Sequence, residues 1–400
     1  MSRLDSIRRE LVGLWAGGTG KTLLAIALGW GLLNGTRMIY PVLLPYFSAE
    51  FDLTLSTAGL LVTLIWLGYA VGQVPGGMLA DRHGERSVLT ASVSMVVVGV
   101  TVVLLSPTAA TLFGATALVG LGLSQYPIAR ITALSDLYPD RIGRALGVTM
   151  AAGDIGQTVL PPIASVLAVA VAWRLGLGFV LPLLCITAVV IWLTLPAPDP
   201  DLEEGDDGSS ESLRYVVREL RSPVLAVMGV ILFLFIFVWQ TFSAFYPTYL
   251  VEQKGLSSTM AGGLFGLFFA VGVVVKPVAG MAYDRIGLRG SLPLVLLGSI
   301  VGLALLPFVD GLVGLVFVTV LSSTMLGSGA ITQSYLAEII PPEIQGTGLG
   351  VIRSSASVLG ASGPLVFGVI AERGYFDAGY LLLALIIALG TLLTLRMPRE

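Results

Sequence analysis

The stretch GMLADRHGERS, residues 77–87, lies between two long apolar segments, and GMAYDRIGLRG, residues 280–290, repeats it 203 residues later. Both copies read G-M-x-x-D-R-x-G-x-R, and both follow an apolar segment of similar length. A repeat of this kind indicates that one structural unit occurs twice in the chain.

Two further similarities keep the same order along the two copies. SDLYPDRIGRALGV, residues 135–148, matches AEIIPPEIQGTGLGV, residues 337–351, with one inserted residue. Asn34 and the pair Tyr40-Pro41 match Gln240 and the pair Tyr246-Pro247. Three similarities in one order favour duplication of a whole six-segment unit.

The composition predicts a membrane protein that crosses the bilayer many times. Of the 400 residues, 55% are hydrophobic and only 12% are charged, and the mean hydropathy is +0.91. Soluble proteins carry about 25% charged residues. The apolar runs are about 20 residues long, which is the length of a membrane-spanning helix rather than of a barrel strand. We predict twelve spans, over residues 22–46, 56–79, 87–105, 110–137, 146–171, 175–195, 223–250, 260–283, 291–308, 312–338, 347–370 and 379–396.

Basic residues orient these spans. With the N-terminus inside, fifteen Lys and Arg residues fall on the cytoplasmic side and three, Arg174, Lys254 and Arg373, on the other. This asymmetry, with an even number of spans, predicts a multi-pass protein of the cell (plasma) membrane with both termini cytoplasmic. Residues 1–10 are polar and no cleavage site follows, so we expect no secretory signal, and residues 5–16 suit a short interfacial helix.

An acidic stretch divides the chain. Residues 196–212 read PAPDPDLEEGDDGSSES, a composition too polar to fold alone. We therefore predict an N-terminal half over 1–195, a cytoplasmic linker over 196–221 and a C-terminal half over 222–400. The predicted fold is all-α, with twelve transmembrane helices in two pseudo-symmetric six-helix halves.

Several function classes are excluded by composition. The chain has one Cys (Cys185) and one His (His83), which argues against disulfides, the usual zinc sites and Cys/His catalysis. The net charge of −3 and the lack of a basic patch argue against nucleic-acid binding. The segment AGGTGKT, residues 16–22, ends like a phosphate-binding loop but has Trp15 where that motif needs Gly. We expect no catalytic residue, no metal and no cofactor.

The repeated loop motif resembles the signature of the major facilitator superfamily, whose members consist of two repeated six-helix halves. It falls on Gly77, Asp81, Arg82, Gly84 and Arg86, and in the second half on Asp284 and Arg285. The resemblance implies a secondary transporter that works by alternating access, and we expect it to function as a monomer. Gly77 would let two helices approach closely, Gly84 would permit a tight turn, and Asp81 would latch one conformer. A role in folding and topology alone is the alternative for this motif.

Five charged residues fall inside the predicted spans: Arg37, Arg130, Asp154, Lys276 and Arg353. Charges within a span are costly and usually mark a functional site. Four cations against one anion leave an excess of positive charge, which an anionic substrate would balance. The sequence thus predicts transport of a small organic anion, a carboxylate or a phosphate ester. Efflux of drugs or of another neutral or cationic solute is the alternative, and a membrane enzyme or a receptor-like sensor are more distant ones.

Neutral residues complete the predicted substrate site. Asn34 shares a helix face with Arg37, Tyr126 lies one turn from Arg130, and Gln240 is a buried amide that needs partners. Trp239 and its aromatic neighbours in the same span are assigned to packing. An Arg in the first span followed eight residues later by Pro, here Pro45, resembles organic-anion branches of the superfamily.

The single intramembrane carboxylate has three candidate roles. Asp154 could form a structural pair with Arg130, a gate with Lys276 across the two halves, or the site of proton coupling. In the last case its protonation would change during the transport cycle.

Overall fold

The computed structural model describes residues 19–196, 222–341 and 345–397, and every regular element in these ranges is a helix. The predicted interfacial helix over 5–16 and nearly all of the predicted linker lie outside the described residues. The helices are α2 (Gly20–Phe51), α3 (Leu55–Val71), α4 (Gln73–Leu104), α5 (Ala109–Leu137), α6 (Ile142–Ala170), α7 (Trp173–Gly178), α8 (Val180–Thr194), α10 (Pro223–Glu252), α11 (Ser258–Leu305), η2 (Leu306–Phe308), α12 (Leu312–Ser322), η3 (Ser323–Gly327), α13 (Ser328–Ile339), α14 (Gln345–Gly360), α15 (Gly363–Glu372) and α16 (Phe376–Thr394).

Ten helical segments of the described chain are long and apolar enough to cross a membrane. Counted as crossings, these segments and one shorter helix account for the twelve predicted spans, as follows. The segment Ser258–Phe308 contains two of them, and the shorter helix Leu55–Val71 supplies one more together with the start of α4. The predicted single spans over 56–79, 175–195, 312–338 and 347–370 are each broken, at Gly72, Phe179, Ser323–Gly327 and Ala361–Ser362 respectively.

Two glycines turn the chain at the repeated loop motif. Gly84, inside α4, has φ 75° and ψ 154°, and Gly287, inside α11, has φ 62° and ψ −175°. These positive φ angles are open to glycine and strained for other residues. The tight turn predicted at Gly84 is confirmed, and its repeat partner 203 residues later adopts the equivalent turn.

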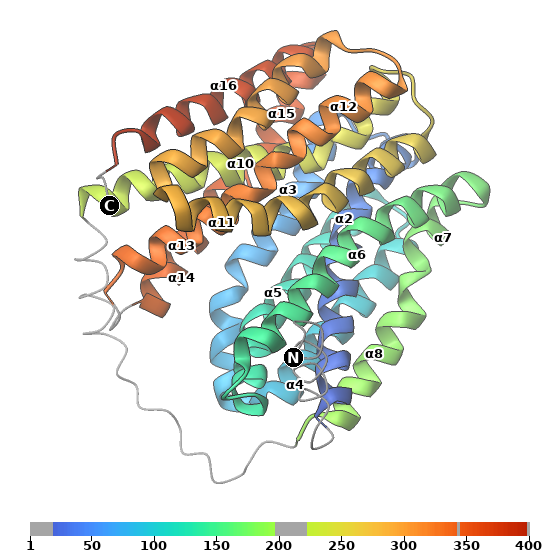
Figure 1. The fold of residues 1–400 in the computed structure, drawn as a ribbon. Coiled ribbons are helices and arrows are strands. Elements are labelled where there is room, and N and C mark those ends of the chain that lie inside the picture. Colours follow the sequence, from blue (N-terminus) through green and yellow to red (C-terminus); the bar gives the residue numbers. More distant parts are fainter. Residues whose placement is uncertain (1–18, 197–221, 342–344, 398–400) are drawn as a thin grey trace, which may run out of the picture.

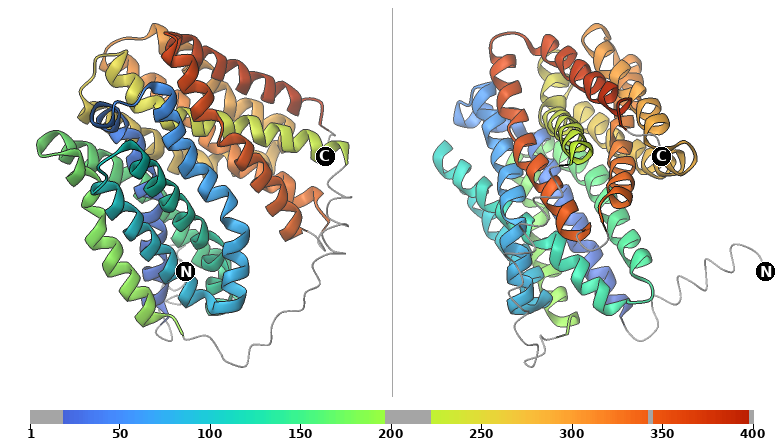
Figure 2. Two further views of the ribbon diagram at one scale, coloured as in Figure 1. Left: turned by 180° about the vertical axis from the view of Figure 1, so that it is seen from behind. Right: turned by 90° about the vertical axis from the view of Figure 1, so that its left-hand side faces the viewer.

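The helices form two bundles that meet at one end and diverge at the other. Helices α2 to α8 form the first bundle and α10 to α16 the second (Figure 1). Figure 2 shows the same divergence from behind, with α13 and α14 well apart from α4 and α5. We call the end where α3 and α11 begin the closed end, and the opposite one the open end.

Two pseudo-symmetric helix contacts hold the closed end together. A β-carbon on Gly59 of α3 would lie 2.3 Å from the carbonyl oxygen of Pro364 of α15. At the repeat-equivalent place, a β-carbon on Gly262 of α11 would lie 2.6 Å from the β-carbon of Ser165 of α6. Both approaches exclude any larger side chain, so glycine is what allows the bundles to touch here.

Hydrogen bonds across the bundles accompany these contacts. The Ser165 hydroxyl donates to the Ser258 carbonyl, and the Leu365 amide donates to the Thr63 hydroxyl at 3.3 Å. The Ser56 amide at the start of α3 donates to the Glu372 carboxylate at 3.1 Å. The closed end is therefore sealed by both packing and polar contacts.

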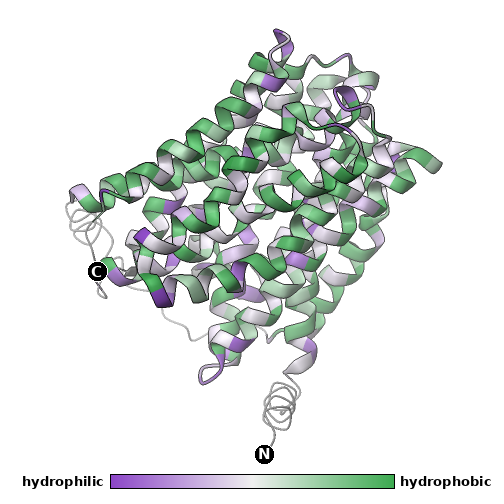
Figure 3. Cartoon of the chain, turned by 45° about the horizontal axis from the view of Figure 1, so that its top comes forward, coloured by the Kyte–Doolittle hydropathy of each residue, from purple (hydrophilic) through white to green (hydrophobic). Residues whose placement is uncertain are grey.

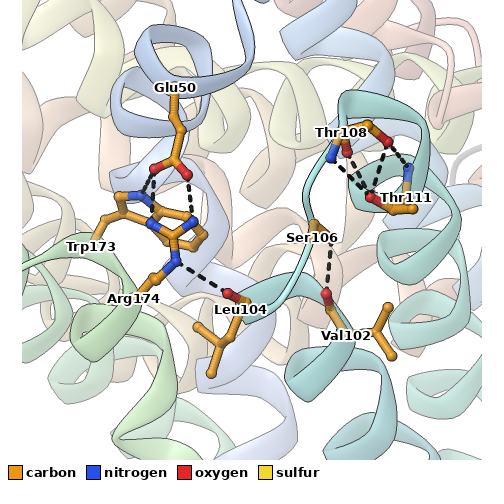
Figure 4. A network of polar contacts seen from close by, with 8 residues as sticks. All are labelled: Glu50, Val102, Leu104, Ser106, Thr108, Thr111, Trp173 and Arg174. Carbon is orange, nitrogen blue, oxygen red and sulfur yellow. Dashed lines mark hydrogen bonds and ion pairs between the residues drawn. The ribbon is translucent and has the colours of Figure 1, made fainter.

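Within the first bundle, a polar cluster ties α2 to α7 and α4 (Figure 4). Arg174 pairs with the Glu50 carboxylate through its two terminal nitrogens, Nη1 and Nη2, and its Nε donates to the Leu104 carbonyl at 3.1 Å.

The helices are apolar along most of their length, and hydrophilic residues lie mainly near the helix ends (Figure 3). This distribution is that of a lipid-facing protein.

Candidate functional site

Arg37 is buried at the centre of α2 and has an aromatic enclosure. Its Nη2 donates to the Asn34 Oδ1 at 2.8 Å, and its guanidinium carbon lies 4.3 Å from the ring centre of Trp66 and 4.8 Å from that of Tyr69. The Nε atom is buried without a hydrogen-bond partner. A guanidinium stacked on two rings is held in place with donors still free, which suits it to bind a ligand anion.

Arg130 of α5 is also buried, and its guanidinium also lies against an aromatic ring. Its Nη1 donates to the Thr149 hydroxyl of α6 at 2.8 Å, and its guanidinium carbon lies 4.0 Å from the ring centre of Trp30. Its Nε is also buried without a partner. The charge of Arg130 is therefore not balanced by a carboxylate among the described residues, and the two groups that hold it, Thr149 and Trp30, are uncharged.

Asp154 of α6 and Lys276 of α11 form an ion pair that joins the two bundles. Their side chains are 19% and 33% exposed, so the pair is only partly buried. Of the two pairings considered for Asp154, the one with Arg130 does not form here, because Arg130 contacts Thr149 and Trp30. The pairing considered with Lys276, across the two halves, is the one that forms.

Arg353 of α14 donates to the Gln333 Oε1 of α13 at 3.1 Å. Arg353 is an exposed residue. The hydrogen-bond partners of Arg37, Arg130 and Arg353 named above are all uncharged. No carboxylate pairs with any of these three arginines among the described residues.

The remaining neutral candidates differ in how free they are. The Tyr126 hydroxyl donates to the Ile26 carbonyl at 2.9 Å and its ring stacks on Trp30, so in this conformer it supports the platform beneath Arg130. The Asn34 amide has a partner on each side, since its oxygen accepts from Arg37 and its nitrogen donates to the Trp30 carbonyl. Gln240 of α10 is 2% exposed, and its Oε1 has no partner.

The loop motif lies at the open end. Arg82, Asp284 and Arg285 are exposed, and the guanidinium carbon of Arg86 lies 4.1 Å from the ring centre of Trp192. The side chain of Asp81, the predicted latch, lies outside the described part of the structure.

The close approach predicted for Gly77 is not found. A β-carbon there would lie 3.5 Å from the nearest atom, of Ile128, which is ordinary contact. The close approach is made by its neighbour Gly76, whose β-carbon would lie 3.1 Å from the Gln125 α-carbon. The rotation of the helix decides which of two adjacent glycines faces α5.

Three aromatic residues of the site were not predicted. Trp66 and Tyr69 enclose Arg37, and Trp239, assigned above to packing, contacts Trp66 with ring centres 4.8 Å apart. The spacing of Trp66 and Tyr69, three residues apart and thus on one helix face, is the signal that could have revealed them.

Two helical bundles of membrane-spanning length, closed at one end and containing buried arginines with no carboxylate partner among the described residues, are typical of a membrane transport protein. Residues 26–334 match the Major Facilitator Superfamily, and the chain belongs to this family. It is a multi-pass membrane protein and a secondary transporter, not an enzyme. The resemblance and the fold class predicted from the sequence are thereby confirmed.

Two relatives that are named as transporters align with most of the chain. It is 24% identical to the "Hexuronate transporter" of Bacillus subtilis (strain 168), covering 91% of this chain and 90% of the relative. It is 26% identical to the "Probable sulfoacetate transporter SauU" of Cupriavidus necator, covering 90% and 89%. A solved structure, a bacterial homologue of the human lysosomal transporter Spinster in an inward-facing, unoccupied conformation, shares the fold with a TM-score of 0.80 at 16% identity, covering 96% and 97%.

Proposed function

We propose that this transporter moves a small organic anion, a carboxylate or a phosphate ester, across the plasma membrane by alternating access. The observation that carries the proposal is Arg37, whose buried guanidinium has no carboxylate partner among the described residues and keeps a donor free. Burying such a charge is costly unless an anion shares its environment. A bound carboxylate or phosphate supplies that anion.

The charge inventory supports an anion over a cation. Lys276 is neutralised by Asp154, and Arg37, Arg130 and Arg353 remain. A cationic solute would need a free carboxylate, yet the one deep in the predicted spans is already paired. The two relatives described above are named for organic anions, which supports the same substrate class.

Orientation and mechanism follow from the same proposal. The basic residues of the loops support a cytoplasmic position for both termini and for the open end. The anion then enters the open end, binds near Arg37, and is released after the bundles rock about the site. The two halves, over 1–195 and 222–400, are the moving bodies, joined by the segment over 196–221.

The test is counterflow in proteoliposomes, with D-glucuronate, sulfoacetate and glycerol 3-phosphate as anions and with glucose and choline as neutral and cationic solutes. We expect exchange of at least one anion, its loss in Arg37→Ala, and normal exchange in Arg373→Ala, an arginine on the exposed surface of the closed end. The Arg37→Ala variant should still insert, because removing a charge from a span eases insertion. Exchange of choline or glucose alone, or normal anion exchange by Arg37→Ala, would overturn the proposal.

A further inference from the structure

Asn34 and Gln240 occupy equivalent places in the two bundles. They stand six residues before the matched Tyr40 and Tyr246. The Tyr246 hydroxyl bonds to the Thr319 hydroxyl. At the matched places of the first bundle, the hydroxyls of Tyr40 and of Thr116, 203 positions before Thr319, are both buried without a hydrogen-bond partner. Both amides are buried, Asn34 on α2 and Gln240 on α10, and these two helices contact each other.

The two amides differ in what satisfies them. The Asn34 Oδ1 accepts from Arg37, three residues further along α2. The residue three positions after Gln240 is Ser243, and its hydroxyl donates to the Gln240 backbone carbonyl at 3.1 Å instead of to the side chain. The Gln240 Oε1 is thus a buried acceptor that lacks the donor its counterpart has. A buried polar atom of this kind costs free energy unless a ligand or a water completes it.

A second unsatisfied group lies on the preceding residue. The Trp239 Nε1 is a buried donor without a partner, and the Trp239 ring packs against Trp66, the ring on which Arg37 is stacked. Near the Trp66–Trp239 pair, the first bundle provides the cation of Arg37. The second bundle provides the Gln240 oxygen as an acceptor and the Trp239 N–H as a neutral donor. These are complementary to different groups of one ligand.

We infer that the anion carries a hydroxyl group, which Gln240 and Trp239 recognise while Arg37 binds the charge. This inference rests on the proposed function and narrows its substrate class to small organic anions that carry a hydroxyl group. An ionised carboxylate, sulfonate or phosphate diester only accepts hydrogen bonds, so it cannot satisfy the Gln240 Oε1. A hydroxyl both donates and accepts, so it suits this amide even if the amide turns over and presents its N–H.

The experiment compares two ligands of equal charge and ring size, D-glucuronate and cyclohexanecarboxylate, by thermal shift of the purified full-length protein. We expect D-glucuronate to bind at least about tenfold more tightly, since one unmet hydrogen bond at a buried site has this effect. In Gln240→Leu the affinity for D-glucuronate should fall about tenfold, and that for cyclohexanecarboxylate should stay unchanged. Thr241→Val is the matched control, because the Thr241 hydroxyl bonds within its own helix to the Phe237 carbonyl.

The outcomes separate this inference from the proposed function. Equal binding of the two ligands, or an equal loss of both in Gln240→Leu, overturns the hydroxyl role while anion transport stands. If neither carboxylate binds and no other anion is exchanged, the proposed function fails as a whole. A Gln240→Leu protein that does not fold is replaced by Trp239→Phe, which keeps the ring and removes only the N–H, and the same selective loss is expected there.

Discussion

The glycine contacts at the closed end lead to a quantitative prediction. In Gly59→Ala the new β-carbon would lie 2.3 Å from a backbone oxygen, and a backbone atom cannot rotate away. An ordinary contact needs about 3.5 Å, so α3 and α15 must separate by about 1 Å. Overpacking of this kind costs about 1–3 kcal/mol. The cost applies only when this end is closed, and about 2 kcal/mol shifts the ratio of the two conformers about thirtyfold.

The assay reads how often the closed end opens. Ala261, 1% exposed, lies beside Gly262 in the equivalent contact and becomes the single reporter in an Ala261→Cys, Cys185→Ser background. A membrane-impermeant maleimide should label Gly59→Ala faster, by up to about thirtyfold. Gly263→Ala is the matched control, because a β-carbon there meets nothing within 4 Å. If both glycine variants label at the same rate, the glycine contact does not hold this end closed.

Other predictions address the charges and the turns. Arg37→Lys keeps the charge but loses the planar stacking, so exchange of the transported anion should fall about tenfold at equal protein levels; exchange at the original rate would show that charge alone suffices. Asp154→Asn should abolish accumulation driven by a pH gradient and keep anion counterflow if Asp154 is the proton-coupling site, and persistent accumulation would leave it only the role of neutralising Lys276. A double-mutant cycle of Lys276→Ala and Asp154→Ala should give a coupling of about 1 kcal/mol in thermal stability, since the pair is part-exposed; strict additivity would contradict the pair. Gly84→Ala should cost about 1–3 kcal/mol of stability because its φ is positive, whereas Gly280→Ala, with open space around it, should melt like the original protein.

Much of the architecture could be predicted from local sequence patterns. Apolar segments near 20 residues long predict membrane helices wherever they occur, so composition and segment length sufficed for the twelve crossings. The repeat of residues 77–87 at 280–290 predicted the two halves. The turn at Gly84 could also be predicted, because a glycine in a short polar loop is typical of a tight turn, and a turn depends on only a few neighbouring residues. The excess of intramembrane cations was likewise visible, since counting charges within a span needs no knowledge of neighbours.

Contacts between distant segments required the tertiary structure. Arg37 is enclosed by Trp66 and Tyr69 of the next helix, and Asp154 pairs with Lys276 rather than with Arg130. Each of these depends on how helices rotate and cross, which is decided by the packing of whole bundles and not by hydropathy along one segment. The same holds for Gly76 and Gly77, adjacent in the chain but facing different surroundings. What the sequence alone determined is which segments span the membrane and how much charge they carry; which side chains meet, and at which end the bundles close, was decided by packing between residues far apart in the chain.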